Sequence, residues 1–391
     1  MRTVCVLTGS RSDYAFLKPV MQKIKKSPVL RLYTIATGMH LLPEFGKTID
    51  TMISEGFSPN ATVAMYGDNI SRHRKKRTTF HYESLGRAIK GIGKILERVK
   101  PRFLVLLGDR LEALAGALAA STMSIAIAHI HGGDIASSGH IDESIRRAIA
   151  KFAHIHFAAS EESAQRLVNS GEERRRVYAV GSPYADSILM EKLRTKENIC
   201  AELKLDINKP VLVCIQHPTM MFYKKSKELM LETLAAVETL AADGFQTVVI
   251  YPNNDTGGEG IIEAVEEFRS RGNIKIAENL PHAQFLSLLG VATVLIGNSS
   301  CAFMEAHYFN LPAVNIGERN KDREKRELVV DCGYSRQEIA QSVKKALEIR
   351  KTSITKNTCS LNPTAGASEA IVKILSKTKI NRRLLKKQFS L

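Results

Sequence analysis

The chain has 391 residues, of which 44% are hydrophobic, and this is enough apolar material for two ordinary domains. Its 56 Lys and Arg against 40 Asp and Glu give a net charge of +16, which favours anionic ligands without choosing between nucleic acid, lipid and a phosphorylated small molecule. No apolar run approaches the roughly 18 residues that span a bilayer, and the first strand pattern begins at Thr3 without a signal-peptide layout. We therefore expect a cytoplasmic protein. Its six scattered cysteines predict reduced thiols rather than disulfides or a zinc knuckle.

Strand-like apolar runs alternate with helical patterns along the whole chain, which predicts an α/β fold of doubly wound parallel sheets. In the first half we expect strands at 3–8, 30–37, 103–107, 125–130, 156–159 and 177–180, and helices near 13–25, 80–99, 111–121, 141–152 and 161–170. In the second half we expect strands at 211–216, 247–251, 274–276, 294–297 and 313–316, and helices near 227–243, 259–271, 282–290, 302–308 and 336–350. The basic tail 382–387 is expected to form a terminal helix docked on the body.

A domain boundary is predicted where Gly181-Ser182-Pro183 ends a strand and a polar stretch follows, closed by Pro210. The prediction places one doubly wound domain at residues 1–182, a linker at 183–209 and a second doubly wound domain at 210–370. Two such domains facing each other leave a cleft at the carboxyl ends of their strands, where ligands of open α/β sheets bind.

Polar clusters follow the first and third long strands. The turn Gly9–Asp13 carries Arg11 and Ser12, which could contact a phosphate or a sugar, but it lacks the signatures of a P-loop or a dinucleotide site. Gly108-Asp109-Arg110 brings an Asp and an Arg out of the sheet together, either to bind a ligand or to form a structural salt bridge.

The strand that ends near residue 130 carries His129 and His131 on one face. No third ligand recurs at a suitable spacing, so a metal site is not expected. Acid/base work or a substrate hydrogen bond fits His131, and a buried core histidine fits His129. The helix that follows opens with Asp142 and Glu143 and continues to Arg146.

The second half shows the same arrangement, with Gln216-His217-Pro218 and Pro252-Asn253 at strand tips. A later strand breaks into Gly297-Asn298-Ser299-Ser300, and a helix starting at Ser299 or Ser300 would direct two hydroxyls and unpaired N–H groups at one point, which suits a diphosphate. Glu305 could then hold a ribose diol. An N-cap followed by a surface Glu has the same pattern. Arg319 and Arg323 could meet phosphate oxygens or belong to the basic surface.

Taken together and in this order, several of these segments resemble signatures of the UDP-N-acetylglucosamine 2-epimerase family, and the resemblance covers almost the whole chain. They are Gly108-Asp109-Arg110, Ile141–Arg146, Gln216-His217-Pro218, Pro252-Asn253 and Gly297-Asn298-Ser299-Ser300. The resemblance implies a glycosyltransferase-B-like fold with two Rossmann-like domains and a C-terminal helix, residues 371–391, that crosses back onto the first domain. It implies a small-molecule nucleotide sugar as ligand, no nucleic-acid or membrane partner, and a homo-oligomer, a dimer or a tetramer.

The resemblance also implies roles for individual residues. The nucleotide is expected on the second domain, with His217 and Asn253 on the phosphate and uridine side, Gln284 near the base, Ser299 and Ser300 on the diphosphate, and Glu305 on the ribose. Arg11, Ser12, Arg319 and Arg323 would complete the clamp. Around the hexose the matching positions are His40, Asp109, Arg110, His131, Asp142, Glu143 and Arg146.

Two features favour the hydrolysing branch of the family, the type found in sialic-acid and legionaminic-acid pathways. The first turn reads Gly-Ser-Arg-Ser-Asp-Tyr, and His131 stands where non-hydrolysing bacterial enzymes have a candidate catalytic glutamate. The implied reaction converts UDP-N-acetylglucosamine and water to N-acetylmannosamine and UDP by elimination and hydration, so no nicotinamide or metal cofactor is expected. Asp109, His131, Asp142 and Glu143 would share the acid/base roles, with Arg146 beside them, and Asp142 or His131 is favoured as the proton carrier.

Three alternatives stay open on the same residues. The first is a hydrolysing 2-epimerase of UDP- or GDP-N,N'-diacetylbacillosamine, and the second is the reversible, non-hydrolysing UDP-N-acetylglucosamine 2-epimerase. The third is a non-catalytic nucleotide-sugar or nucleic-acid binding protein, which the net charge would suit. Asp109, Asp142 and Glu143 argue against it, because carboxylates near a diphosphate weaken simple binding.

Overall fold

The computed structural model describes residues 1–43, 46–66, 81–135, 141–252, 257–269, 274–278, 280–323, 326–355 and 366–388. Within them the chain forms two compact units: unit 1 comprises 1–135, 141–190 and 366–388, and unit 2 comprises 191–355. Unit 1 therefore runs to Met190 rather than to Ser182. The expected linker at 183–209 contains two helices, α7 (Pro183–Met190) in unit 1 and α8 (Lys196–Leu203) in unit 2.

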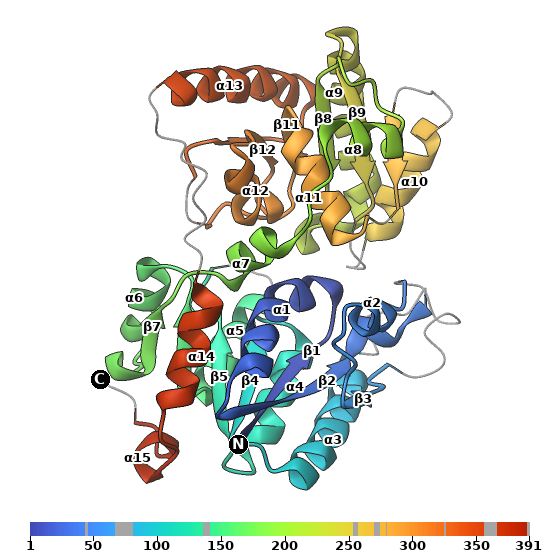
Figure 1. Ribbon diagram of the computed structural model, residues 1–391. Coiled ribbons are helices and arrows are strands. Elements are labelled where there is room, and N and C mark those ends of the chain that lie inside the picture. The colour runs from blue at the N-terminus through green and yellow to red at the C-terminus, as the bar shows by residue number, and fades with distance from the viewer. Residues whose placement is uncertain are drawn as a thin grey trace. The chain divides into compact units, whose positions relative to one another are not determined.

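Unit 1 is built on a seven-stranded parallel sheet with the strand order β3-β2-β1-β4-β5-β6-β7 (Figure 1). The strands are β1 (Arg2–Thr8), β2 (Leu30–Thr37), β3 (Ala61–Val63), β4 (Phe103–Leu107), β5 (Ala126–Ile130), β6 (Ile155–Ala158) and β7 (Val177–Ala179). The helices are α1 (Arg11–Lys26), η1 (Gly38–Leu41), α2 (Ile49–Ser54), α3 (His81–Val99), α4 (Leu111–Ser121), α5 (Ile141–Phe152), α6 (Glu161–Asn169), η4 (Arg174–Arg176), α7, α14 (Ala367–Lys377) and α15 (Arg382–Leu385).

Unit 2 repeats the design with a six-stranded parallel sheet in the order β10-β9-β8-β11-β12-β13. Its strands are β8 (Val211–Ile215), β9 (Gln246–Ile250), β10 (Ile274–Ala277), β11 (Val294–Gly297), β12 (Ala313–Ile316) and β13 (Val329–Cys332). Its helices are α8, η5 (Met220–Lys225), α9 (Ser226–Ala242), α10 (Gly258–Arg269), α11 (His282–Val291), α12 (Cys301–Met304), η6 (Ala306–Phe309) and α13 (Arg336–Thr355).

Both sheets are covered on their two faces, which is why their central strands are buried along their length. Alternate residues of β1 enter different cores: Val4 and Val6 pack with α1 and α14, whereas Cys5 and Leu7 pack with α3 and α4. In unit 2 the residues of β8 divide in the same way between one core with α9, α10 and α13 and another with α11 and α12. The prediction of doubly wound parallel sheets is confirmed.

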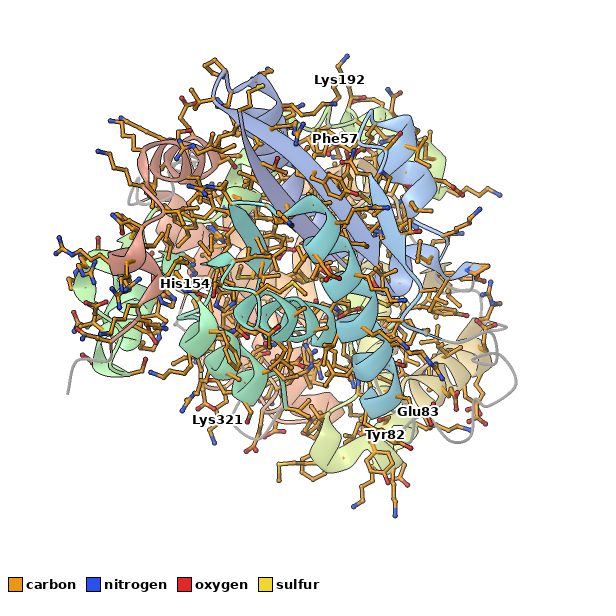
Figure 2. All side chains as sticks on the ribbon, turned by 90° about the horizontal axis from the view of Figure 1, so that it is seen from below. Phe57, Tyr82, Glu83, His154, Lys192 and Lys321 are labelled. Atoms are coloured by element: carbon orange, nitrogen blue, oxygen red, sulfur yellow. The ribbon has the colours of Figure 1, made fainter. Side chains whose placement is uncertain are left out.

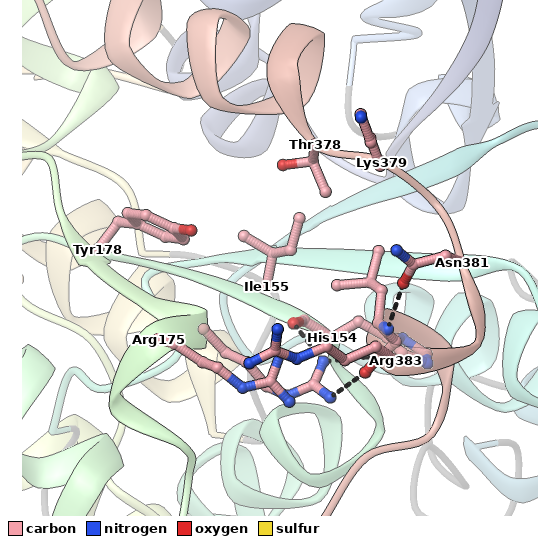
Figure 3. A pocket seen from close by; sticks show the side chains of 10 residues that line it. His154, Ile155, Arg175, Tyr178, Thr378, Lys379, Asn381 and Arg383 are labelled. Atoms are coloured by element: carbon pink, nitrogen blue, oxygen red, sulfur yellow. Dashed lines mark hydrogen bonds between the residues drawn. The ribbon is translucent and has the colours of Figure 1, made fainter.

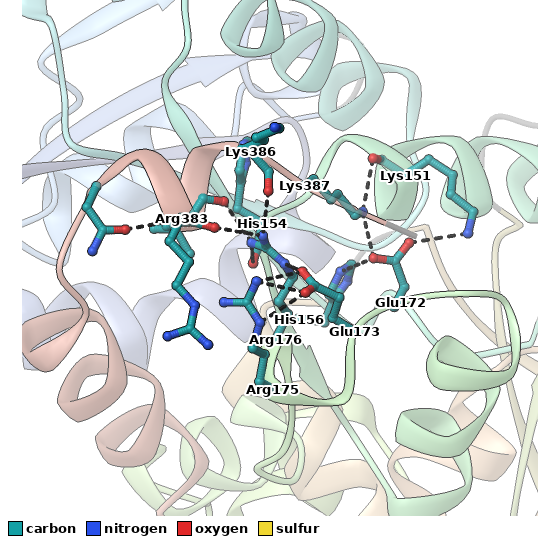
Figure 4. Close-up of polar contacts among 12 residues, drawn as sticks. Lys151, His154, His156, Glu172, Glu173, Arg175, Arg176, Arg383, Lys386 and Lys387 are labelled. Atoms are coloured by element: carbon teal, nitrogen blue, oxygen red, sulfur yellow. Dashed lines mark hydrogen bonds and ion pairs between the residues drawn. The ribbon is translucent and has the colours of Figure 1, made fainter. Parts of the chain in front are cut away.

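The C-terminal segment belongs to unit 1, where α14 packs against α1 and α7. The expected single helix over 371–391 is instead two helices, α14 and α15. The fully buried Arg176 binds the end of this segment, because its guanidinium donates to the carbonyl oxygens of His154 (3.2 Å), Arg383 (3.2 Å), Leu384 (2.8 Å) and Lys386 (3.3 Å) (Figure 4). It also pairs with Glu173, which Arg175 contacts at 2.7 Å.

A second buried ion cluster lies beside Arg176 (Figure 4). The carboxylate of Glu172 has no exposed surface and accepts from Lys387 (2.6 Å) and from His156 (3.0 Å), with Lys151 at 3.3 Å. Burial opposes the ionisation of Glu172, but the hydrogen bonds and charges of these partners prevail and lower its pKa to about 2. Lys387 is thereby held in the body of unit 1, since its ammonium also donates to the carbonyl of Ala150 at 2.7 Å.

An open cavity of about 270 Å³ lies between the C-terminal segment, which follows α14, and the amino ends of β6 and β7 (Figure 3). Its lining includes Tyr178, Lys379 and Arg383. Other basic residues, such as Lys192 and Lys321, project from the surface (Figure 2). No helix among the described residues is long and apolar enough to cross a membrane.

Several short elements were not predicted. β3 has three residues and β13 has four, and both are edge strands, so neither produces a long apolar run. The prediction of one helix over 302–308 is wrong. α12 ends at Met304, and after Glu305 the chain forms the 3₁₀ turn η6, which Asn310 caps with φ +48°.

Candidate active site

The strand order of each sheet reverses at one point, between β1 and β4 in unit 1 and between β8 and β11 in unit 2. Ligands of open α/β sheets bind outside the carboxyl ends of the strands at such a point. The predicted site residues Arg11, Ser12, Asp109 and Arg110 follow β1 and β4, and His217, Ser299 and Ser300 follow β8 and β11. Each unit therefore has its own candidate half-site, and each is described separately.

In unit 1 the loops after β1, β2 and β4 meet around Glu112, a buried carboxylate on α4 that is 2% exposed. It lies 3.4 Å from Nε of Arg110 and raises the pKa of that guanidinium. A Cβ at Gly9 would come within 2.6 Å of its side chain, and a Cβ at Gly38, whose φ is +62°, would collide with its carboxylate. The glycines thus allow a buried carboxylate to hold Arg110 at the switch point.

The Arg146 cluster, which comprises Asp109, Asp134, Glu143 and Arg146, lies at the carboxyl ends of β4 and β5. Arg146 is 5% exposed, and its guanidinium donates to a carboxylate oxygen of Asp109, to the carbonyl of Asp134 (2.8 Å) and to Glu143 (3.1 Å). A buried guanidinium requires such partners. Arg146 therefore fixes the predicted carboxylates Asp109 and Glu143 beside one another, and Asp109 remains 22% exposed.

His131 follows β5 directly, in a left-handed conformation with φ +63° that few non-glycine residues adopt. Its Nδ1 lies 2.6 Å from Oδ2 of Asp134, and its Nε2 lies 3.1 Å from Oγ of Ser182. The turn Gly132-Gly133 permits this approach, since a Cβ at Gly133 would collide with the carbonyl of Ser163. The structure thus places His131 in a row of hydrogen-bonded side chains that runs from the carboxylate of Asp134 through the imidazole to the hydroxyl of Ser182.

Two other histidines of unit 1 belong to the core. The prediction for His129 is confirmed: it is fully buried, its Nε2 lies 2.7 Å from the carbonyl of Gly108, and burial lowers its pKa to about 3. His40, expected to contact the sugar, is also fully buried, and Thr8 and Thr48 occupy both ring nitrogens at 2.9 and 2.8 Å. His40 therefore supports the ends of β1 and β2 and does not present a ring nitrogen to a ligand.

The remaining predicted residues of unit 1 lie in first turns of helices. Arg11 and Ser12 are exposed at the start of α1, and Oγ of Ser12 lies 2.8 Å from Oγ of the N-cap Ser10. Asp13, which accepts from the N–H of Gly9 at 3.1 Å, has its pKa raised by burial. Asp142 is half-buried in the first turn of α5, and its charge adds to the rise in the pKa of Arg110.

In unit 2 the switch point is held together by Asn298, which is 1% exposed. Its side-chain oxygen accepts from the N–H of His217 (2.6 Å), and its amide donates to the carbonyl of His217 (2.8 Å). Gly297 precedes it with φ +128°, and a Cβ there would collide with the carbonyl of Ile215. The end of β8 is therefore bound to the end of β11 through one asparagine.

The segment after β12 supports the same turn. Asn320 is buried and donates to the carbonyl of Asn298 (2.8 Å), as Arg319 does at 3.2 Å. Arg323 donates from Nε to the side-chain oxygen of Asn320 at 2.8 Å. The two predicted arginines thus lie at the switch point, and Asn320 joins them to the Gly297–Ser300 turn.

The Ser299-Ser300 pair is half-buried and precedes α12, whose N-cap is Ser300. The expected helix is only four residues long, so its dipole is small, and any anion there would depend on hydroxyls and local N–H groups. Glu305 is the C-cap of α12 rather than a residue one turn inside a longer helix.

Three further predictions concern the nucleotide side. His217 lies half-buried at the tip of β8, and burial, with the charge of Arg319, lowers its pKa well below the usual value. Gln284 lies in the first turns of α11 and donates to Glu202 at 2.9 Å. Asn253 lies outside the described residues. No group of three His, Cys, Asp or Glu that could hold a metal occurs within the described part of the chain.

Sequence reasoning assigned no role to Glu112, Asp134, Ser182, Asn298 or Asn320. Asp134 had a signal, because it follows His131 by three residues and a two-glycine turn. Ser182 had none, since it lies 51 residues from His131 in sequence.

Comparison with known proteins agrees with this architecture. The family model described as UDP-N-acetylglucosamine 2-epimerase matches residues 22–376. The chain is 30% identical to the UDP-N,N'-diacetylbacillosamine 2-epimerase (hydrolyzing) of Legionella pneumophila, over 89% of each chain. It is also 30% identical to a UDP-N-acetylglucosamine 2-epimerase of Neisseria meningitidis, over 90% of this chain and 89% of that one. A crystal structure of the UDP-GlcNAc 2-epimerase from Neisseria meningitidis bound to UDP-GlcNAc aligns with a TM-score of 0.81 at 19% identity, over 97% of this chain and 100% of that one.

Two parallel sheets of this order, each with polar residues gathered at its switch point, define an α/β protein of the glycosyltransferase-B-like class. Within that class, the chain belongs to the UDP-N-acetylglucosamine 2-epimerase family.

Proposed function

We propose that this protein is a hydrolysing UDP-N-acetylglucosamine 2-epimerase, which converts UDP-N-acetylglucosamine and water to N-acetylmannosamine and UDP. The observation that carries the proposal is His131, which pairs with Asp134 at the carboxyl end of β5. The family resemblance implies that non-hydrolysing bacterial members have a candidate catalytic glutamate at this position. The Legionella pneumophila relative, which is named as a hydrolyzing 2-epimerase, supports the same branch.

In this proposal unit 2 binds the uridine nucleotide. Ser299, Ser300, Arg319 and Arg323 serve the diphosphate, because hydroxyl and guanidinium groups are donors suited to phosphate oxygens. Glu305 serves the ribose, and His217, Asn253 and Gln284 serve the remaining phosphate, uridine and base contacts. In unit 1, Arg11 and Ser12 at the start of α1 are further candidate contacts for a phosphate or a sugar. The buried bridge through Asn298 supports this assignment, since it fixes His217 and the serine turn relative to each other.

Unit 1 acts on the sugar. The hydrogen on C2 has no adjacent carbonyl, so a carboxylate or imidazole cannot remove it from the ground-state sugar at a useful rate. Departure of UDP must lead: as the C1–O bond lengthens, positive charge builds at C1 and makes the C2–H acidic. A base then takes the proton, the C2–H electron pair forms the C1=C2 double bond, and UDP leaves with the electrons of the C1–O bond, giving a 2-acetamidoglucal.

Hydration of the glucal completes the reaction. Water adds its oxygen to C1. A proton reaches C2 on the face opposite to the one from which the original hydrogen was removed, and the product is N-acetylmannosamine. Two acid/base groups on different sides of the sugar are therefore required. Asp109, His131, Asp142 and Glu143 supply them, and Arg146 holds two of these carboxylates in place while Arg110 contacts the sugar.

A second candidate substrate is UDP-N,N'-diacetylbacillosamine, because the relative at 30% identity from Legionella pneumophila carries that substrate in its name. The two sugars share C1, C2 and the 2-acetamido group and differ at C4 and C6, so the same acid/base groups would serve both.

The test is a side-by-side assay of the purified protein with each nucleotide sugar, following UDP by phosphorus NMR and the sugar by proton NMR. The proposal predicts free UDP and N-acetylmannosamine from UDP-N-acetylglucosamine. Release of UDP from the diacetamido sugar alone would transfer the proposal to the second substrate. Epimerisation with UDP still attached would refute the hydrolysing assignment.

A further inference from the structure

The surroundings of His131 fix where its protons lie. Nδ1 faces Oδ2 of Asp134 at 2.6 Å, and a carboxylate only accepts hydrogen bonds, so Nδ1 carries a proton. Oδ1 of Asp134 accepts from Oγ of Ser163 at 3.0 Å, which holds the carboxylate in its orientation. In the neutral imidazole, Nε2 is consequently the nitrogen with the free electron pair.

Nε2 does not face outward. It lies 3.1 Å from Oγ of Ser182, which itself accepts from the N–H of Tyr184 at 3.2 Å at the start of α7. Because Nε2 carries no proton in this tautomer it can only accept, so the hydroxyl of Ser182 donates to it while accepting from Tyr184. The ring is 5% exposed, and the ring of Phe16 packs edge-on against it at 5.4 Å. Ser182 is half-buried and therefore more exposed than His131, which it contacts.

The geometry points to Ser182 as a further catalytic residue that carries the proton between the sugar and His131, with Asp134 as a positioning residue. This inference rests on the proposed function. In the elimination step Oγ of Ser182 takes the proton from C2 while its own proton moves to Nε2. The C2–H electrons form the C1=C2 bond, and the C1–O electrons leave with UDP. The resulting imidazolium is stabilised by the carboxylate of Asp134, as in acid/base rows of hydroxyl, imidazole and carboxylate.

Ser182 also caps α7, since the N–H of Ala185 binds its carbonyl at 3.1 Å and the N–H of Tyr184 binds its side chain. A purely structural role is therefore the competing explanation, and the variants must separate the two. Ser182→Asn keeps an equally good N-cap and a donor for Nε2, but an amide does not relay protons. Ser182→Thr keeps the hydroxyl. Ser187→Ala, on the same helix, removes a buried hydroxyl that has no hydrogen-bond partner among the described residues and is the matched control.

We expect Ser182→Asn to lower kcat by about 100-fold or more, in the range of general acid/base catalysis, with KM within about twofold of the wild type. Ser182→Thr should retain kcat within about threefold, and Ser187→Ala should match the wild type. Asp134→Asn should lower kcat at least as much as Ser182→Asn. Wild-type kcat in Ser182→Asn would overturn the relay.

A readout that needs no turnover separates this inference from the proposed function. Nitrogen-15 NMR of the His131 ring, assigned by loss of its signals in His131→Gln, should show the neutral tautomer protonated on Nδ1. That tautomer should persist in Ser182→Asn and shift toward Nε2 in Asp134→Asn. A wild-type ring protonated on Nε2 would refute the proposed hydrogen-bond chain from Asp134 through His131 to Ser182. If the wild-type protein released no UDP from either sugar, the proposed function would fail. These spectra alone would then decide whether the hydrogen-bond chain from Asp134 through His131 to Ser182 exists.

Discussion

Replacement of Arg176 by methionine tests how the C-terminal segment is held on unit 1. Arg176 is 2% exposed, and its guanidinium donates to four carbonyl oxygens, three of which belong to residues 383, 384 and 386. Methionine keeps much of the apolar stem but removes every donor. The variant leaves the carbonyl of His154 without this donor in the interior and removes one of the two cationic partners of Glu173.

The magnitude follows from the burial of these groups. A buried acceptor left without its donor costs about 1–3 kcal/mol. The carbonyl of His154 bears that cost whether or not the segment is docked. The carbonyls of Arg383, Leu384 and Lys386 bear it only in the docked state, because they recover hydration when the segment opens, and since they are partly buried the cost is about 1 kcal/mol each. We therefore expect the free energy that holds α15 on the body to fall by about 3 kcal/mol, which corresponds to a roughly 100-fold larger population of the locally opened state at about 1.4 kcal/mol per tenfold.

Hydrogen exchange of the Leu384, Leu385 and Lys386 amides, each bonded within α15 or to its N-cap, measures this opening directly. Arg175→Met is the matched control, because Arg175 is 41% exposed and contacts the same Glu173, so its loss should cost about 1 kcal/mol or less. If exchange in Arg176→Met stays within about threefold of that in Arg175→Met, the hydrogen bonds of Arg176 contribute little to holding the C-terminal segment, and this prediction is wrong.

Three further predictions concern acid stability, the nucleotide half-site and the acid/base groups. The pKa of Glu172 is lowered from 4.5 to about 2, so the stability that its ionised form contributes is present above about pH 4.5 and is lost as the pH falls through 2. The Glu172→Gln variant should therefore show a flatter decline of its urea midpoint over that range than the wild type, and parallel curves would contradict this. Asn298→Ala removes both hydrogen bonds to the His217 backbone, so we expect the free energy of unfolding to fall by about 2–4 kcal/mol. We also expect UDP affinity, measured by calorimetry, to fall at least about tenfold. Unchanged affinity in a destabilised protein would show that these bonds do not support binding. Asp142→Asn should lower kcat by about 10²–10⁴ with little change in KM in a UDP-release assay, and near-normal turnover would remove Asp142 from the acid/base groups.

The parallel sheets were predictable because their central strands are buried on both faces and read as continuous apolar runs, as in β4 and β8. The gathering of polar residues was also predictable, since parallel strands bring their carboxyl ends to one edge of a sheet. The short strands β3 and β13 were not, because three or four residues at an edge carry too little pattern.

The contacts that organise the candidate site could not be read from local sequence. Ser182 reaches His131 across 51 residues, and Asn298 reaches His217 across 81, so neither pair has a spacing that periodicity could reveal. His40 illustrates the same limit: the family resemblance implies a sugar contact for it, whereas the structure buries its ring between two threonine hydroxyls. Burial of a polar residue depends on the elements packed over it, which the local pattern does not encode.

In the proposed reaction UDP leaves before water adds, so C2 loses its hydrogen and takes a new one from solvent. The most direct measurement is a proton NMR time course of UDP-N-acetylglucosamine with the protein in deuterated water. We expect free UDP and N-acetylmannosamine carrying deuterium at C2 from the first turnover. N-acetylmannosamine that retains its original hydrogen at C2, or deuterium at C2 with UDP still attached, would contradict it.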